Sequence, residues 1–223
     1  PHPGEISLAH RGVLFLDEFP EFPRHVLEAL RQPVEDGIVT ISRSAGRVNF
    51  PAKFMLVAAQ NPCPCGFFGN PTKNCKCSLN QILRYQRRVS GPMLDRIDIH
   101  LDVPAVKVEK LHNDETLSEK SISIRKRVQK ARDIQTKRFS GLKGQRKIFT
   151  NAEMSSKECE ELIQLSSDSE IFLKKILEDN LVSARGYYRI LKTARTIADL
   201  EASLEVKKEH LAEAFSYRIR NRE

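Results

Sequence analysis

Several features that define other protein classes are absent from this sequence of 223 residues. No apolar run approaches the ~20 residues that a membrane-spanning helix needs, and no basic-then-apolar leader opens the chain. These absences exclude a membrane-spanning helix and predict a cytoplasmic protein. The Gly-Lys dipeptide is also absent, which excludes a complete phosphate-binding loop of the G-x-x-x-x-G-K-S/T kind from these residues. The chain starts at Pro1 rather than at Met, which suggests a piece of a longer chain.

Composition and charge indicate a globular protein with a polyanionic partner. Apolar residues make up 40% of the chain and charged residues 30%, which suits one sizeable or two small domains with their own cores. The net charge is +8, and a basic balance favours a polyanion. Much of the excess lies in residues 120–147, the basic stretch, which contains one acid, Asp133. Its eleven basic residues are Lys120, Arg125, Lys126, Arg127, Lys130, Arg132, Lys137, Arg138, Lys143, Arg146 and Lys147. The alternative interpretation is a solvated helix face.

The first half of the chain has an α/β pattern. The apolar run VLFL at 13–16 predicts a buried strand of a parallel sheet that is covered on both faces. A second buried strand ends at Asn61, because the following Pro62 cannot continue a ladder. Between them, residues 37–51 alternate on both sides of Ser44-Ala45-Gly46 and predict a β-hairpin. A third strand is expected at 97–103.

The second half of the chain is expected to be helical. Helical spacing occurs in five segments, at 121–139, 151–165, 168–181, 184–202 and 207–220. An α/β part followed by an all-helical part predicts two packed units. We therefore expect an α/β core at 1–104, a linker at 105–121 and a helical domain at 122–223.

The stretch GVLFLDEF ends its apolar run on two carboxylates, Asp17 and Glu18. In a nucleotide hydrolase such a strand delivers the first carboxylate to Mg²⁺ through a water. The second carboxylate polarises the water that attacks the terminal phosphate. The alternative is an acidic cap of a following helix.

Three later residues could act on the same phosphates. Asn61 ends the neighbouring strand and can hydrogen-bond the attacking water and the terminal phosphate. Arg96 could reach a neighbouring subunit's nucleotide, and Arg185 begins a helix that could fold onto the phosphates. Such cations stabilise the charge that develops during phosphoryl transfer. The alternatives are a turn residue for Asn61 and surface ion pairs for the two arginines.

Four long motifs carry a family resemblance. They are PGEISLAHRGVLFLDEFPEF, AAQNPCPCG, SGPMLDRIDIH and SARGYYRILKTARTIADL. The sequence resembles the AAA+ ATPases of the branch that contains the magnesium chelatase I subunit and the minichromosome maintenance helicases. It is most similar to the magnesium chelatase-like ComM (YifB) family, over nearly the whole chain and least across 105–150. The resemblance implies a P-loop NTPase core, truncated at its N-terminal side, with a pre-sensor-1 β-hairpin and an all-helical lid domain.

The resemblance assigns roles to the polar residues named above. It makes Asp17 and Glu18 the Walker B pair, Asn61 the sensor-1 residue, Arg96 the arginine finger and Arg185 the sensor-2 arginine that contacts the ATP phosphates. The cofactors implied are ATP and Mg²⁺, the latter held by Asp17 through water. Family members carry the phosphate loop upstream of Walker B. Because this sequence lacks that loop, we expect truncation rather than a dead enzyme, and the 223 residues alone should bind ATP poorly and hydrolyse none.

The hairpin at 42–47 matches the pre-sensor-1 hairpin, which points into the central pore in hexameric relatives. Arg43 and Arg47 could then hold DNA phosphates there. The alternative for each is a solvated hairpin tip.

Four cysteines form a C-x-C-x9-C-x-C arrangement: Cys63, Cys65, Cys75 and Cys77. Structural zinc sites usually consist of four ligands in a tetrahedron, and four thiolates can supply them. A cytosolic setting disfavours disulfides. We expect zinc ahead of free thiols, and disulfides last, in a Cys-rich insert at 63–77. Cys159 lies in a predicted helix and is expected to pack in the core.

Three functions are compatible with these patterns. The first is an ATP-driven, hexameric DNA motor, and the resemblance implies branch migration on branched or single-stranded DNA in recombination and natural transformation. The second is a magnesium chelatase-like ATPase that remodels a protein partner. The third is a non-enzymatic, basic, zinc-stabilised DNA-binding module with decayed ATPase motifs.

Overall fold

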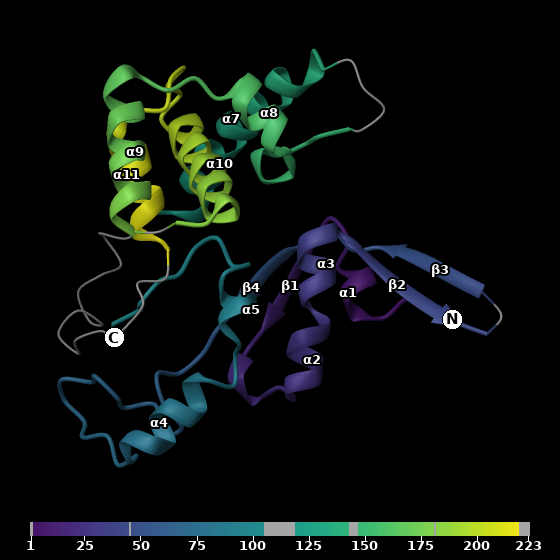
Figure 1. The fold of residues 1–223 in the computed structure, drawn as a ribbon, viewed down its shortest axis with the longest axis vertical. Helices are drawn as coiled ribbons and strands as arrows, with labels where there is room; N and C mark the ends of the chain where they lie inside the picture. The colour runs from purple at the N-terminus through teal and green to yellow at the C-terminus, as the bar shows by residue number, and fades with distance from the viewer. Residues whose placement is uncertain (1, 45, 105–118, 143–146, 181, 219–223) are drawn as a thin grey trace. The chain divides into compact units, whose positions relative to one another are not determined.

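The computed structural model describes residues 2–44, 46–104, 119–142, 147–180 and 182–218. The chain divides into two compact units, Pro1–Ile97 and Asp98–Glu223. The first unit mixes short helices with strands, and the second is built from helices (Figure 1). This mixed α/β composition agrees with the predicted fold class. The predicted linker at 105–121 lies mostly outside the described residues, and the proposed domain limits stay a prediction.

The described residues of the first unit form ten short elements. In chain order they are α1 (Glu5–Leu8), β1 (Val13–Leu16), the 3-10 helix η1 (Phe19–Glu21), α2 (Arg24–Ala29), α3 (Arg31–Asp36), β2 (Ile38–Arg43), β3 (Gly46–Pro51), β4 (Met55–Ala58), α4 (Leu79–Gln86) and α5 (Gly91–Leu94). Strands β1 and β4 pair in parallel, from Val13 opposite Met55 to Leu16 opposite Ala58. The two strands predicted from the apolar runs are therefore present, although neither contains a fully buried residue and β4 ends at Ala58 rather than at the predicted Asn61.

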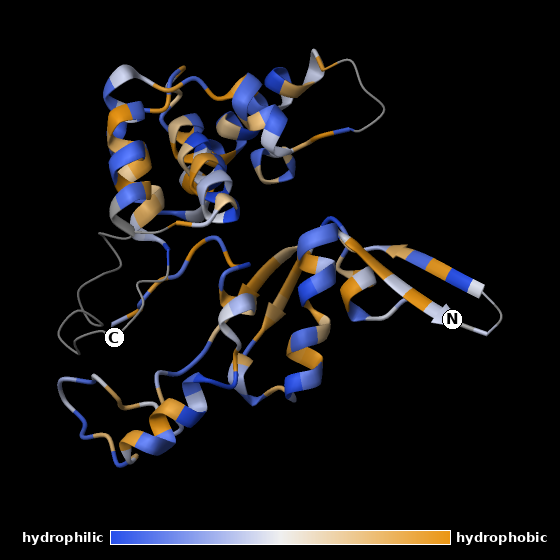
Figure 2. Ribbon diagram, viewed as in Figure 1, coloured by the Kyte–Doolittle hydropathy of each residue, from blue (hydrophilic) through white to orange (hydrophobic). Residues whose placement is uncertain are grey.

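Only one face of the β1–β4 pair is covered among the described residues. Leu14, Leu16 and Leu56 pack against a buried cluster that includes Leu27 of α2 and Met93 of α5. Side chains alternate between the faces of a strand, so Val13, Phe15, Met55 and Val57 lie on the opposite face. These four are 59%, 59%, 63% and 40% exposed. The prediction of coverage on both faces is therefore wrong for the described part of the chain, although both strands are hydrophobic throughout (Figure 2).

The third strand predicted at 97–103 is also wrong, because no strand occurs at 97–104. The backbone N–H of Ile97 donates to Leu94 and extends the α5 turn. The N–H of His100 donates to the carbonyl of Tyr217, 2.8 Å away, within the second unit. A backbone donor used in this contact is not available for a β-ladder.

The predicted hairpin is confirmed. Strands β2 and β3 pair antiparallel from Ile38 opposite Pro51 to Arg43 opposite Gly46. The Thr40 hydroxyl donates across the ladder to Asn49 Oδ1 at 2.9 Å. Gly46 has a φ of +135°, a conformation that glycine adopts without a Cβ clash. The hairpin projects as an arm of the first unit (Figure 1).

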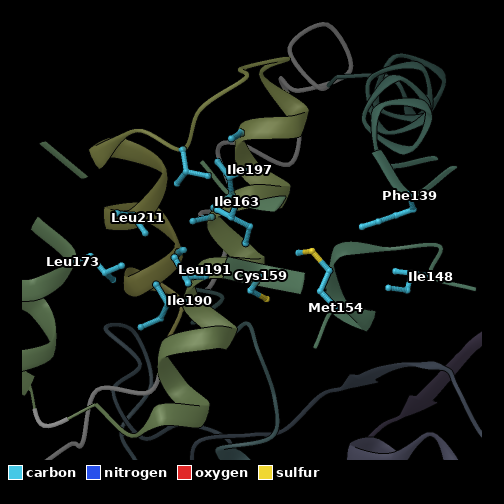
Figure 3. Close-up of a cluster of buried hydrophobic side chains, with 14 residues drawn as sticks. Phe139, Ile148, Met154, Cys159, Ile163, Leu173, Ile190, Leu191, Ile197 and Leu211 are labelled. Atoms are coloured by element: carbon cyan, nitrogen blue, oxygen red, sulfur yellow. The ribbon is translucent and has the colours of Figure 1, made fainter. Parts of the chain in front are cut away.

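The second unit is a helical bundle. Its elements are α7 (Ser121–Ser140), η2 (Asn151–Glu153), α8 (Ser156–Leu162), α9 (Ser167–Asn180), α10 (Ala184–Leu200) and α11 (Lys208–Ser216). Four of the five predicted helical segments correspond to one helix each, whereas 151–165 forms a 3-10 turn and the short α8. Figure 3 shows Ile190, Leu191 and Ile197 of α10 among the side chains of the buried core. Cys159 of α8 is 1% exposed in this core, as expected for a packing residue.

A buried ionic network ties α7 to α10. Arg138 of α7 donates to Asp199 Oδ2 at 2.9 Å and to Asn151 Oδ1 at 2.8 Å. Arg195 donates from Nε to Asp199 Oδ1 at 3.1 Å and from Nη1 to the Leu204 carbonyl at 2.6 Å. Arg138, a member of the basic stretch, therefore has a structural partner, whereas residues 121–130 of α7 are exposed. Among the described helices, none combines the length and the apolarity needed to cross a bilayer.

Candidate functional site

The carboxyl ends of β1 and β4 are joined by two backbone hydrogen bonds. The N–H of Ala59 donates to Leu16, and the N–H of Phe19 donates to Ala59, each at 2.9 Å. These bonds hold the Asp17-Glu18 turn beside the residue that follows β4. Asn61 comes two positions later. The structure therefore brings the two predicted Walker B residues and the start of the predicted sensor-1 segment to the same end of the strand pair.

Asp17 and Glu18 form a tight turn with exposed side chains. Asp17 Oδ1 accepts a hydrogen bond from the Glu18 N–H at 2.8 Å. Glu18 has φ 50° and ψ 42°, a left-handed conformation that costs a non-glycine residue about 1–3 kcal/mol and often occurs at functional sites. The Glu18 side chain makes no capping hydrogen bond to the 3-10 helix η1 that follows it. This geometry does not support the alternative interpretation of an acidic helix cap.

Asn61 is exposed, but helix α4 holds the backbone around it. The Tyr85 hydroxyl forms a hydrogen bond with the Asn61 backbone, and Gln86 Nε2 donates to the Pro62 carbonyl at 3.0 Å. Tyr85 is 5% exposed, and burial raises the pKa of its hydroxyl. A capping box at Ser78 begins α4, since Ser78 Oγ accepts from the Gln81 N–H and Gln81 Oε1 accepts from the Ser78 N–H. The described contacts thus fix the backbone of Asn61 and leave its amide exposed at the strand end.

Arg96 is held inside the first unit. Its Nε lies 3.1 Å from Oε2 of Glu35 in α3, and its side chain is 13% exposed. Its Nη1 donates to the Pro92 carbonyl at 2.6 Å. The ion pair that sequence analysis named as the alternative is present, with the Arg96 side chain largely buried and Glu35 exposed. A finger role for Arg96 would require it to leave Glu35, and this role stays a prediction.

Arg185 is the second residue of α10 and is exposed. The helix begins at Ser183, whose Oγ accepts a hydrogen bond from the Gly186 N–H at 3.1 Å. A Cβ at Gly186 would lie 2.8 Å from Val182 Cγ1, so the close approach of this turn requires glycine. Arg185 thus begins a helix of the second unit as expected, whereas Asp17, Glu18 and Arg96 belong to the first.

The two predicted DNA-binding arginines lie at the end of the hairpin arm. Arg43 is the last residue of β2, and Arg47 is the second residue of β3, opposite Ser42. The Arg47 side chain is exposed.

A basic groove in the first unit was missed by sequence analysis. This open groove of about 720 Å³ lies between the start of α2 and α4, and its lining includes Arg24, Arg84, Arg87 and Arg88. Arg88 also forms an ion pair with Glu21. Arg84 lies in the last turn of α4, and Arg87 and Arg88 directly follow its end; this cluster of arginines is the sequence signal that could have revealed the groove.

The four predicted metal-binding cysteines converge. The Sγ atoms of Cys63, Cys65, Cys75 and Cys77 all lie within 4.8 Å of one another, in an arrangement that could hold a metal such as zinc. All four are free thiols. Backbone N–H groups, that of Phe67 first, lower the pKa of the Cys65 thiol to about 6, which favours its thiolate.

Comparison with known sequences places the chain among magnesium chelatase-like proteins. The family model for the magnesium chelatase subunit ChlI matches residues 1–111, and the model for the ChlI C-terminal region matches residues 118–218. Competence protein ComM of Haemophilus influenzae is 47% identical over 218 residues, which cover 98% of this chain and 41% of ComM. The chain belongs to the magnesium chelatase-like ComM (YifB) family.

Two other relatives also match nearly the whole of this chain. The YifB protein of Escherichia coli is 44% identical over 100% of this chain and 42% of YifB. The chloroplastic magnesium-chelatase subunit ChlI of Nicotiana tabacum is 22% identical over 99% of this chain and 45% of ChlI. The chain thus spans about two fifths of the length of the ComM and YifB relatives that it matches.

Proposed function

We propose that these residues are the part of an ATP-driven DNA motor that carries its catalytic carboxylates and its helical lid. The observation that supports this most directly is the joined ends of β1 and β4, where Asp17 and Glu18 lie beside the segment that leads to Asn61. Carboxylates and an amide at one strand end are the groups that phosphoryl transfer to water requires. The motor would be a ring of six subunits in the cytoplasm.

Each residue has a distinct role in this proposal. Asp17 would hold the Mg²⁺ of MgATP through water, and its exposed carboxylate, oriented by the Glu18 N–H, is a suitable oxygen donor. The ion would neutralise phosphate charge when bound. Glu18 would accept a proton from the attacking water, and Asn61 would orient that water. Arg96 of a neighbouring subunit and Arg185 of the lid would stabilise charge on the transferring phosphoryl group.

The proposal requires a phosphate loop from outside these 223 residues, because the sequence contains no Gly-Lys dipeptide. The exposed face of the β1–β4 pair supports this requirement. Parallel sheets normally have both faces covered, and Val13, Phe15 and Met55 are more than half exposed. We propose that the phosphate loop and its neighbouring elements cover this face in a longer protein.

Three basic surfaces support DNA as the partner. They are the hairpin arm with Arg47, the basic groove with Arg84 and Arg87, and the exposed first half of α7. Arginine contacts to backbone phosphates supply affinity that does not depend on sequence. The similarity to a relative named as a competence protein supports branched DNA handled during recombination and natural transformation as the substrate.

The alternative enzyme function is a remodelling ATPase with a protein partner. The similarity to chloroplastic magnesium-chelatase subunit ChlI over 99% of this chain favours it. A non-enzymatic DNA-binding module is the remaining possibility, and any ATP turnover that depends on Glu18 excludes it. Stimulation of turnover by DNA distinguishes the motor from the remodelling enzyme.

The decisive experiment uses the longer protein that carries these residues behind its phosphate loop. The protein is mixed with ATP and a synthetic three- or four-way DNA junction, and strand exchange is followed on a gel, with Glu18→Gln as the control. We expect strand exchange that disappears in the control. Turnover without strand exchange or DNA stimulation would favour the remodelling enzyme instead.

A further inference from the structure

The Cys-rich insert brings four sulfur atoms to one point from two short loops. Cys63 and Cys65 follow Asn61, whereas Cys75 and Cys77 precede α4. The Sγ of Cys63 lies 3.4 Å from that of Cys65 and 3.7 Å from that of Cys75, and Cys65 and Cys75 are 3.5 Å apart. Sulfur atoms bound tetrahedrally at the usual Zn–S length of ~2.3 Å would be about 3.8 Å apart. The cysteine spacing therefore fits a single zinc ion.

The backbone of the insert is shaped around the sulfur atoms. The N–H of Gly66 donates to the Cys63 carbonyl at 3.0 Å, which closes a tight turn between the first two cysteines and the segment that follows. Gly66 and Gly69 have φ values of +79° and +78°, which favour glycine. The N–H of Phe68 donates to Cys63 Sγ at 3.4 Å. Backbone donors of this kind orient metal-bound thiolates.

The insert also carries positive charge suited to this site. Four thiolates around one Zn²⁺ have a net charge of −2, and binding releases the protons that the thiols still carry. Lys73 and Lys76 lie inside the insert, and the insert contains no acidic residue. The two ammonium groups would offset the charge of the occupied site.

The loops are attached directly to the strand end that carries Asn61. Pro62, the residue before Cys63, accepts the hydrogen bond from Gln86 of α4. On the other side of the insert, Cys77 immediately precedes Ser78, the residue that caps α4. A Cβ added at Gly66 would lie 3.8 Å from Asn61 Oδ1, so the Gly66 backbone faces the Asn61 amide. The insert therefore passes beside Asn61 and continues into the helix that holds its backbone.

We propose that Cys63, Cys65, Cys75 and Cys77 bind one structural zinc ion, and that the zinc-bound insert positions Asn61 at the end of β4. Zinc would fasten the two ends of the insert together, so that α4 and the Asn61-Pro62 segment keep their relative position. Asn61 would be positioned by the insert, whereas the cysteines would not touch the nucleotide. The proposed zinc binding depends only on the residues of the insert. Only its consequence for catalysis rests on the proposed function.

Metal analysis of the full 223-residue chain tests the first part. The chain is expressed with zinc, dialysed without chelator and measured by elemental mass spectrometry, with about one zinc ion expected per chain. Replacing both Cys63 and Cys77 with Ser should remove the metal, whereas Cys159→Ser, at a buried cysteine outside the insert, should retain it. Absence of zinc from a folded wild-type chain, or its retention in the double variant, overturns the zinc site.

Hydrogen exchange of the wild-type chain tests the second part without any ATP turnover. Zinc is removed with a chelator, and exchange of backbone amides is compared before removal, after removal and after zinc is restored. We expect protection of 59–61 and 79–86 to fall by at least tenfold and to recover with zinc, while α10 stays unchanged. Loss of zinc with unchanged protection of 59–61 overturns the positioning of Asn61. Because neither readout uses ATP or DNA, either result is independent of the motor proposal.

Discussion

Arg96 and Glu35 form an ion pair within the first unit, with Nε 3.1 Å from Oε2. In the proposed function, Arg96 contacts the nucleotide of a neighbouring subunit. Its guanidinium would then leave the Glu35 carboxylate and bind a phosphate instead. This change of partner would link ring assembly to the packing of α3. The following predictions separate this role and the others from purely structural ones.

In the longer protein, Arg96→Ala should reduce ATP turnover by at least 100-fold, because transition-state charge loses a cation. Mixing it with Glu18→Gln subunits should partly restore turnover, since each Glu18→Gln subunit still offers Arg96 to its neighbour. The measurement is phosphate release at varied mixing ratios. Glu35→Gln is the matched control. It should lower the unfolding free energy by about 1–2 kcal/mol through the broken ion pair while turnover remains. Failure of every mixture to recover would assign Arg96 a structural role.

Glu18→Gln in the longer protein should bind ATP normally and reduce turnover by about 100- to 10,000-fold, the usual contribution of a general base. Nucleotide binding by fluorescence anisotropy and phosphate release are measured on the same preparation. Glu21→Gln, three positions later in the same turn, changes the same charge and should retain turnover. Equal losses in both variants would indicate a general charge effect.

Exchanging Arg84 and Arg87 for Glu in the longer protein should weaken junction DNA binding about tenfold or more. The slope of log affinity against log salt should also fall, by about 0.9 for each DNA phosphate that the variant no longer binds. Fluorescence anisotropy at several salt concentrations measures both quantities. Lys174 and Lys175, exposed on α9, provide a charge-matched control pair. If this pair has the same effect, net charge rather than the basic groove determines affinity.

Asp199→Asn should destabilise the helical unit by about 3–5 kcal/mol, the usual cost of breaking a buried ion pair. Burial opposes ionisation of Asp199, but Arg138, Asn151 and Arg195 outweigh burial and hold its pKa below the ordinary value of 3.8. Because the pKa of Asp199 is lower in the folded state, its ionised carboxylate stabilises the fold at pH values above its unfolded-state pKa. This stabilisation is lost as the pH falls through the lowered folded-state pKa. Thermal unfolding between pH 2 and pH 7 should therefore show a steeper acid loss in the wild type than in Asp199→Asn. Parallel curves would contradict the role of this carboxylate.

Local sequence signals predicted the secondary structure well. The apolar run at 13–16, the second apolar run that was expected to end at Asn61, the alternation around Gly46 and the helical spacing after 120 all correspond to elements of the structure, although the second strand ends at Ala58. These signals succeed because they depend on neighbouring residues. The predicted strand at 97–103 failed because its backbone donor at His100 bonds to Tyr217, a partner that no local pattern specifies.

The sequence predicted that Asp17, Glu18 and Asn61 follow neighbouring strands, but it did not predict the contacts of the other candidate site residues. The residues at the ends of β1 and β4 lie together as expected, because parallel strands end at the same edge. The partners of Arg96 and Arg138 could not be predicted, since Glu35 and Asp199 lie far from them in the sequence. Basic residues can bind phosphates or internal carboxylates, and only the fold decides between them.

The uncovered face of the β1–β4 pair also affects how these 223 residues behave in solution. Val13, Phe15 and Met55 form an exposed apolar surface on a chain whose net charge is +8. At low ionic strength, charge repulsion between chains opposes their association through this surface, and added salt screens the repulsion. The isolated chain should therefore form reversible assemblies as salt rises, and light scattering should detect them at salt concentrations where a longer protein with this face covered stays dispersed.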